Sequence, residues 1–127
     1  IDKNKQIAEF SSKGSNPTAG ILRRTDPNKK PELVAPGMEI LSSWNYGYAY
    51  CSGTSQSAPF VAGIIALLLD AYPKYQHEFN NNSTAILYFK YTFMATAEKL
   101  DYQNVPHDDR YGYGLIKAYE AYIELGK

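Results

Sequence analysis

The segment Cys51–Gly63, CSGTSQSAPFVAG, runs directly into the apolar stretch IIALLL and decides the fold of this chain. A polar turn that contains one glycine leads straight into a helix that is apolar on every side. Such a helix is normally buried in the middle of a domain. We expect it to begin at Ser55 or Gln56 and to end at Ala71, before Pro73, which cannot continue it.

The first turn of the predicted helix carries hydroxyl groups on Thr54, Ser55 and Ser57. Backbone N–H groups at a helix N-terminus lack intrahelical partners and carry partial positive charge, which suits a developing anion. A serine at this place can attack a carbonyl carbon while the N–H groups stabilise the oxyanion that forms. In a simpler interpretation, Thr54 or Ser55 only caps the helix. For a lone serine at a helix start, the cap is the favoured interpretation.

The wider string Gly53–Gly63, GTSQSAPFVAG, resembles the nucleophile motif of the subtilisin-like serine proteases (subtilases, peptidase family S8). The family pattern has Gly-Thr-Ser, two residues, a small residue, Pro, one residue and then Val-Ala-Gly, so Ser55 falls on the nucleophile. The string departs from this pattern at Gln56, where many members carry Met, and at Phe60, where His is frequent. Neither departure removes a group that the chemistry needs.

Four further segments resemble the same family in the same order. They are EFSSKG at 9–14, KPELVAPG at 30–37, MATAEKL at 94–100 and GYGLI at 112–116. The resemblance extends from about residue 8 to residue 122, which is nearly the whole chain. It therefore covers both sides of the nucleophile string.

The resemblance implies an α/β fold, namely the C-terminal part of a mostly parallel sheet with flanking helices, together with a short antiparallel hairpin. Residues 1–127 are expected to form the C-terminal portion of a catalytic domain, with no internal boundary. The implied activity is peptide-bond hydrolysis through an acyl-enzyme on Ser55. The oxyanion hole and the substrate cleft are expected to use Ser52, Gly53, Thr54 and Ser55.

A serine nucleophile needs a general base, which is usually a histidine oriented by a carboxylate. The chain contains only His77 and His107, and neither lies in a pattern that resembles the histidine motif of subtilases. The family's Asp and His motifs, and the Asn that completes the oxyanion hole, precede the serine motif and are missing from this sequence. We therefore expect two partners: the N-terminal part of the same catalytic domain, and a peptide or protein substrate.

Two other classes of function stay open on the sequence. One is a non-catalytic subtilase-like domain that serves binding or structure. The other is a different serine acyl-transferring enzyme that takes its base from a partner chain. The residues do not indicate a compartment, although the family resemblance favours an extracellular or cell-surface location.

Thirteen basic and thirteen acidic residues leave no net charge, so the composition does not favour nucleic acid or an anionic membrane as a partner. We expect no membrane span, because the apolar run Phe60–Leu69 is about half as long as a bilayer requires. The single cysteine, Cys51, excludes an internal disulfide. The sequence contains neither a calcium loop nor a Cys/His zinc set, so we expect no metal and no cofactor.

The remaining pattern predicts short strands and two more helices. Asn45 and Gly47 mark the turn of a hairpin. Ala58, Ala62 and Ala66 form a stripe of small side chains along the first helix, which suits close packing against a sheet or another helix. The expected strands lie at 19–25, 33–35, 38–43 and 46–51, and the expected helices at 83–100 and 115–125.

Overall fold

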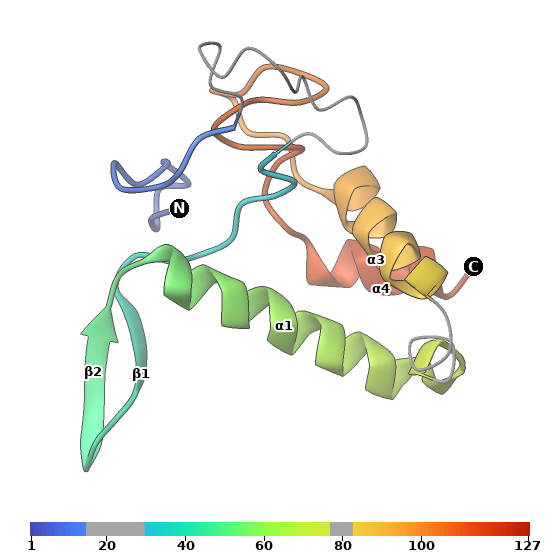
Figure 1. Ribbon diagram of the computed structural model, residues 1–127, viewed down its shortest axis with the longest axis horizontal. Coiled ribbons are helices and arrows are strands. Elements are labelled where there is room, and N and C mark those ends of the chain that lie inside the picture. Colours follow the sequence, from blue (N-terminus) through green and yellow to red (C-terminus); the bar gives the residue numbers. More distant parts are fainter. Residues whose placement is uncertain (15–29, 77–82) are drawn as a thin grey trace.

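The structure is a computed structural model that describes residues 1–14, 30–76 and 83–127 (Figure 1). Its described helices include α1 (Thr54–Ala71), α3 (Ser83–Thr96) and α4 (Ala118–Leu125). Its strands are β1 (Ile40–Trp44) and β2 (Gly47–Cys51). The strand predicted at 19–25 and the side chain of His77 lie outside the described residues.

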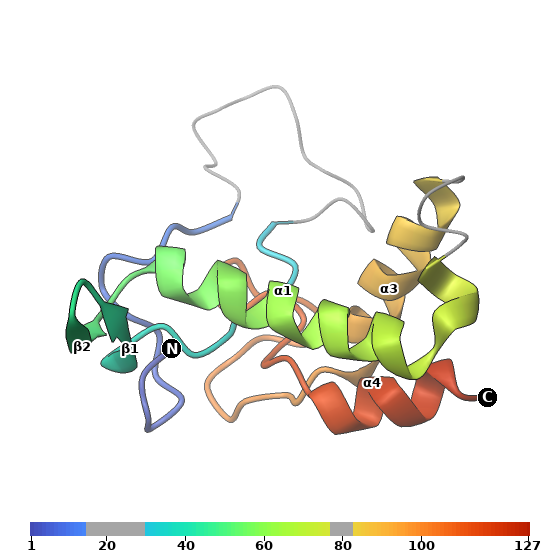
Figure 2. The ribbon, with the colours of Figure 1, turned by 90° about the horizontal axis from the view of Figure 1, so that it is seen from below.

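The main core lies where α1 meets α3 and α4, at the end of the molecule away from the two strands (Figures 1 and 2). Ile64 and Leu68 of α1 are buried there with Phe89 and Phe93 of α3 and with Leu125 of α4. Burying such a side chain contributes about 1.5–3 kcal/mol. The core therefore holds the three helices together at one end and leaves the start of α1 to other contacts.

Two tyrosine hydroxyls attach the chain after α1 to α4. Tyr72 donates a hydrogen bond to the Tyr122 carbonyl at 2.8 Å, and Tyr75 donates one to the Leu125 carbonyl at 3.1 Å. Tyr75 is buried in the core and Tyr72 packs against its edge, and in both residues the ring packs on apolar neighbours while the hydroxyl finds an acceptor. The predicted end of α1, just before Pro73, is confirmed.

β1 and β2 form an antiparallel hairpin, as predicted, with Trp44 paired to Gly47 across a two-residue turn. Asn45 in this turn has a φ of 45°, a left-handed conformation that asparagine tolerates better than most residues do. The hairpin projects from the rest of the described structure and makes no extensive contact with the described helices (Figure 1).

The mostly parallel sheet that the family resemblance implies is not formed within the described ranges, where the only sheet is the antiparallel hairpin. An isolated parallel bridge outside that sheet joins Val34 and Leu115. In this bridge the Val34 N–H donates to the Gly114 carbonyl at 3.0 Å, and the Ile116 N–H donates to the Val34 carbonyl at 3.1 Å. The strand predicted at 33–35 is thus a single bridged position.

Both later helices are shorter than predicted, because α3 ends at Thr96 and α4 begins at Ala118. The two differences have one cause, an antiparallel bridge between Glu98 and Leu115 with N–H···O distances of 2.8 and 2.9 Å. Gly114 permits this contact, since its φ is 126° and a Cβ there would lie 2.2 Å from the Glu98 carbonyl oxygen. The apolar periodicity of the sequence predicted helices that are too long, because a bridged segment also buries alternate apolar side chains.

Much of α1 is uncovered by the described part of the chain. Its buried side chains are Ile64 and Leu68, whereas Phe60 is 45% exposed and Leu67 is 71% exposed. The alanine stripe is exposed too, so the close packing expected of it is not formed here. With 18 residues and a mean hydropathy of 1.3, α1 has the length and composition of a membrane-spanning helix. Core helices of soluble proteins also meet that criterion, so it does not by itself overturn the expectation of no span.

The buried carboxylate of Asp108 organises the loop between α3 and α4. It accepts hydrogen bonds from the N–H groups of Arg110 and Tyr111, and from the N–H and the side-chain amide of Asn104, at 2.8 to 3.1 Å. Burial acts to raise the pKa of Asp108. The hydrogen bonds favour the charged form more strongly and hold this pKa below its usual value.

We expect Asp108→Asn, in the full-length protein that carries this chain, to lower the free energy of unfolding by about 1–3 kcal/mol at neutral pH. The folded-state pKa is lowered, so the carboxylate stabilises the fold above its unfolded-state pKa. This stabilisation is lost as the pH falls through the folded-state pKa. Urea unfolding at neutral and acidic pH should therefore show the difference between the two proteins closing toward acid.

The matched control is Asp101→Asn, which changes an exposed carboxylate in the same loop. It should change the free energy of unfolding little at any pH. A deficit of Asp108→Asn that stayed constant across the pH range would contradict the role assigned to the charge.

Candidate active site

Ser55 is the second residue of α1, which begins at Thr54, and both side chains are exposed. Gly53 is the N-cap residue, in an extended conformation with φ 162° and ψ 163°, so the interpretation of Thr54 or Ser55 as the cap is wrong. The first turn carries no acidic side chain that would compete for its N–H groups. The Ser55 hydroxyl forms no hydrogen bond to the described part of the chain.

Three hydrogen bonds hold the nucleophile loop, residues 52–57, against the segment 35–39. The pairs are Gly53 N–H to the Gly37 carbonyl at 2.7 Å, Glu39 N–H to Ser52 Oγ at 2.8 Å, and Ser57 Oγ to the Ala35 carbonyl at 3.2 Å. Ser55 lies between the bonded residues of the loop. Its backbone is therefore held from both sides.

Gly37 allows the two segments to approach each other closely. A Cβ at this position would lie 2.2 Å from Ser57 Oγ and 2.8 Å from the Gly53 carbonyl oxygen. Side-chain carbons do not approach other atoms so closely, so any larger residue would displace Ser57 or the backbone at Gly53. The sequence pattern alone did not identify this supporting role. The available signal was the Pro36–Gly37 pair, which marks a tight turn.

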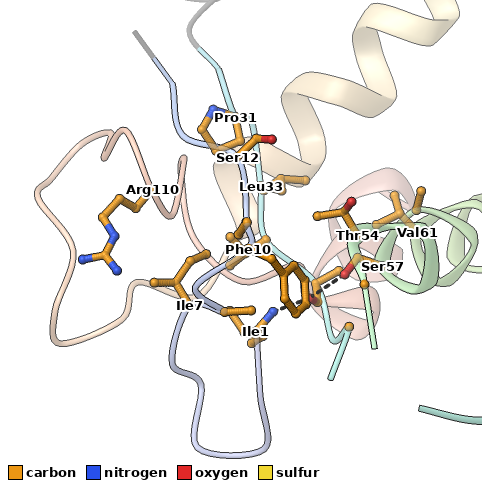
Figure 3. Close-up of a pocket in the computed structure, with 17 residues that line it drawn as sticks. Ile1, Ile7, Phe10, Ser12, Pro31, Leu33, Thr54, Ser57, Val61 and Arg110 are labelled. Carbon is orange, nitrogen blue, oxygen red and sulfur yellow. Dashed lines mark hydrogen bonds between the residues drawn. The ribbon is translucent and has the colours of Figure 1, made fainter. Parts of the chain in front are cut away.

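The N-terminal residue Ile1 is hydrogen-bonded to the same segment, residues 35–37. The Ala35 carbonyl accepts two hydrogen bonds, one from Ser57 Oγ and one from the Ile1 nitrogen at 2.9 Å (Figure 3). The Gly37 N–H in turn donates to the Ile1 carbonyl at 3.1 Å. Ile1 is thus bonded to the residue before and the residue after Pro36, which is the bonding pattern of parallel strands. Ile1, the segment 35–37 and the nucleophile loop thus form one hydrogen-bonded unit.

A cavity of about 300 Å³ adjoins the nucleophile loop (Figure 3). It lies between the N-terminal segment, residues 31–37 and the first turns of α1, and most of its lining is apolar. Phe10, Leu33 and Val61 contribute to its walls, whereas Ser55 does not line it. The cavity therefore borders the loop without enclosing the nucleophile candidate.

No base for Ser55 is found among the described residues. The Nε2–H of His107 donates to the Pro31 carbonyl at 2.9 Å, and its ring meets Tyr113 edge-on with the centroids 5.1 Å apart. This nitrogen is engaged in a structural contact, and His77 lies outside the described residues. Cys51 is half-buried at the end of β2 and forms no disulfide.

The described residues contain no group of three or more His, Cys, Asp or Glu that could hold a metal ion. They bring Ser52, Gly53, Thr54 and Ser55 together in one turn, and they leave His107 engaged elsewhere. The arrangement can present a hydroxyl at a helix N-terminus. It needs a base from outside these residues for that hydroxyl to act as a nucleophile.

Comparison with known proteins matches residues 1–114 to the model of the family described as "Subtilase family". A C5a peptidase of Streptococcus pyogenes is 58% identical over 68 residues, which are 53% of this chain and 5% of that protein. Subtilisin-like protease SBT3.2 of Arabidopsis thaliana is 40% identical over 75 residues, which are 54% of this chain and 9% of that protein.

Among solved structures, the CspB protease of Clostridium perfringens matches with a TM-score of 0.70 and 30% identity, over 93% of this chain and 23% of that one. The chain thus spans less than a tenth of the length of the two curated relatives and less than a quarter of this solved chain. The matched range 1–114 includes the whole nucleophile loop and α1. On this match, the chain belongs to the subtilase family, peptidase family S8, a family of serine proteases.

Proposed function

We propose that this chain supplies the nucleophile part of a subtilisin-type serine endopeptidase. The supporting observation is the position of Ser55, an exposed hydroxyl on the first turn of α1, in a loop bonded on both sides to the segment 35–39. A loop held in this way needs little reorganisation when the hydroxyl attacks a carbonyl carbon. The base, its orienting carboxylate and the Asn of the oxyanion hole are proposed to come from the N-terminal part of the same catalytic domain.

In the proposed reaction, the base takes the hydroxyl proton of Ser55 as Oγ attacks the scissile carbonyl carbon. The carbonyl oxygen becomes an oxyanion, which the N–H groups at the start of α1 stabilise. The C–N bond then breaks, and the base returns its proton to the leaving amine. Water attacks the ester on Ser55 and releases the acid and the free serine. Ser52, Gly53 and Thr54 are proposed to line the cleft beside the scissile bond.

We propose that the N-terminal part of the domain also covers α1, so that residues 1–127 form the C-terminal portion of one catalytic domain. Phe60 and Leu67 are large exposed side chains on this helix, and burying each would contribute about 1.5–3 kcal/mol. The exposed alanine stripe would let a covering segment approach the helix backbone closely. The cavity beside the nucleophile loop offers space for further apolar side chains.

The first test is Ser55→Ala in the full-length protein. We expect peptidase activity to fall by several orders of magnitude, because no other group can form the acyl-enzyme. The free energy of unfolding should change by no more than ~1–2 kcal/mol, the scale of a capping effect. A fluorophosphonate probe should label the wild type at Ser55 and should leave the variant unlabelled.

Ser42→Ala is the matched control, since it removes an exposed hydroxyl on β1 and leaves the bonds that hold the loop around Ser55 in place. It should keep both probe labelling and peptidase activity. Near-normal peptidase activity in Ser55→Ala would sink the proposal. A wild type that takes up no probe would favour a non-catalytic domain.

The second test concerns the support of the loop. We expect Gly37→Ala to lower kcat by roughly 10- to 100-fold, because the added Cβ displaces the backbone that carries Ser55. The double variant Gly37→Ala with Ser57→Ala removes the closer of the two clashing atoms and should recover part of the loss. Steady-state kinetics on a short peptide substrate measure both effects.

Gly47→Ala is the control, since a Cβ at Gly47 meets no atom within 4 Å. It should leave kcat for a short substrate unchanged. If Gly37→Ala kept the wild-type kcat, the close approach at Gly37 would have no part in positioning Ser55.

The third test is the behaviour of residues 1–127 expressed alone. We expect no peptidase turnover, because the serine keeps its proton without a base. The exposed side of α1 should make the isolated chain self-associate, or bind the separately expressed N-terminal part of the domain. Sedimentation measures the size, and adding the N-terminal part should restore probe labelling. A soluble monomer with turnover that Ser55→Ala abolishes would refute this expectation.

A further inference from the structure

The register of the hairpin sorts its side chains onto two faces. Leu41 pairs with Tyr50, and Ser43 pairs with Tyr48. Paired residues of antiparallel strands point to the same side of the sheet. Leu41, Tyr48 and Tyr50 therefore share one face, which we call the tyrosine face. The opposite face near the loop carries smaller side chains, among them Ala49.

The tyrosine face is open to solvent in the structure. Tyr48 is 80% exposed and Tyr50 is 71% exposed, and Tyr46 in the turn next to this face is fully exposed. Trp44 lies on the opposite face in this register. The whole stretch 40–51 contains no charged residue. Exposed aromatic residues without neighbouring charges are typical of the centre of an interface.

The residue types favour a contact that forms and breaks over one that is permanently buried. A tyrosine ring offers a rigid apolar surface at low entropic cost, while its hydroxyl stays hydrated when the surface is free. A hairpin face built for permanent burial would be expected to carry aliphatic side chains, as strands in cores do. Here Tyr46, Tyr48 and Tyr50 alternate with Gly47 and Ala49.

The hairpin continues without interruption into the nucleophile loop. β2 ends at Cys51, and the bond from Glu39 N–H to Ser52 Oγ closes the base of the hairpin at that point. A five-residue strand such as β2 extends roughly 16 Å from the loop, at about 3.3 Å per residue. An extended polypeptide with its scissile bond at Ser55 would reach this face with residues about five positions away.

We propose that the tyrosine face is a docking surface for the polypeptide substrate, beyond the residues that flank the scissile bond. The occupant is an extended, uncharged segment of the substrate that carries apolar side chains. A charged side chain would lose its water against this surface without gaining a partner, so such segments are disfavoured. The inference rests on the proposed function, because it assigns part of the substrate of the same site.

The test compares two quenched peptides that share one cleavage site, chosen from a casein digest by the full-length wild-type protein. The short peptide has about eight residues and ends before the tyrosine face, and the long one has about twenty, with an uncharged apolar extension on each side. The variant is Tyr48→Thr with Tyr50→Thr, which keeps strand-forming residues in β2. Tyr119→Gln on α4 removes an equally exposed tyrosine far from the hairpin and is the control.

We expect the double variant to lower kcat/KM for the long peptide by roughly tenfold, mainly through KM, and to leave the short peptide unchanged. Phenylalanine at both positions should restore most of the loss, since the rings supply the contact. The control should behave as the wild type on both peptides. A third peptide with lysines in the extension should already be a poor substrate and should not respond to the variant.

Other outcomes overturn the inference in distinct ways. An equal loss on both peptides would mean that the tyrosines support the loop and contact no substrate. A large fall in melting temperature without a kinetic difference would mean that the rest of the domain covers this face. No change on either peptide would exclude docking there. Failure of the wild type to take up the fluorophosphonate probe at Ser55 would refute the proposed function itself, and docking of its substrate with it.

Discussion

The hydrogen bond between the Gly53 N–H and the Gly37 carbonyl is the contact on which the arrangement around Ser55 depends. It joins two backbone segments at the turn that starts α1, where Gly37 has no room for a larger side chain. The direction of α1 is fixed at its other end by Ile64 and Leu68 in the core. The nucleophile candidate is therefore positioned by a local backbone contact and by packing several turns away. Neither constraint involves the serine side chain, which stays exposed.

The sequence predicted those features that depend on neighbouring residues. The end of α1 before Pro73 and the hairpin around Asn45 both follow from local patterns. The bridge from Glu98 to Leu115 joins distant segments, so periodicity could not show that it shortens two helices. The need for Gly37 is also non-local, since it arises from a distance to Ser57 that only the folded chain defines.

The base of the proposed triad could not be predicted from these residues, for a different reason. Neither histidine of the chain lies in a sequence context that suits the role, and His107 is bonded to Pro31. The sheet is incomplete in a related way. A parallel sheet needs neighbouring strands and helices on both faces, and the described residues supply one bridge at Val34 and the paired position near Ile1. The exposed side of α1 and the cavity beside it likewise lack neighbours that the described residues do not supply.

Within the described part of the chain, the hairpin is attached to the nucleophile loop at its base and makes no extensive contact with the helices. Substitutions at its distal residues are therefore expected to leave the geometry around Ser55 largely unchanged. Under the docking proposed here, substitutions at positions such as Tyr48 and Tyr50 would change the choice of substrate with little effect on the reaction itself. A hairpin attached in this way would allow the range of substrates to change without moving Ser55. Its sequence could be substituted, exchanged or lengthened while the loop that carries Ser55 keeps its position.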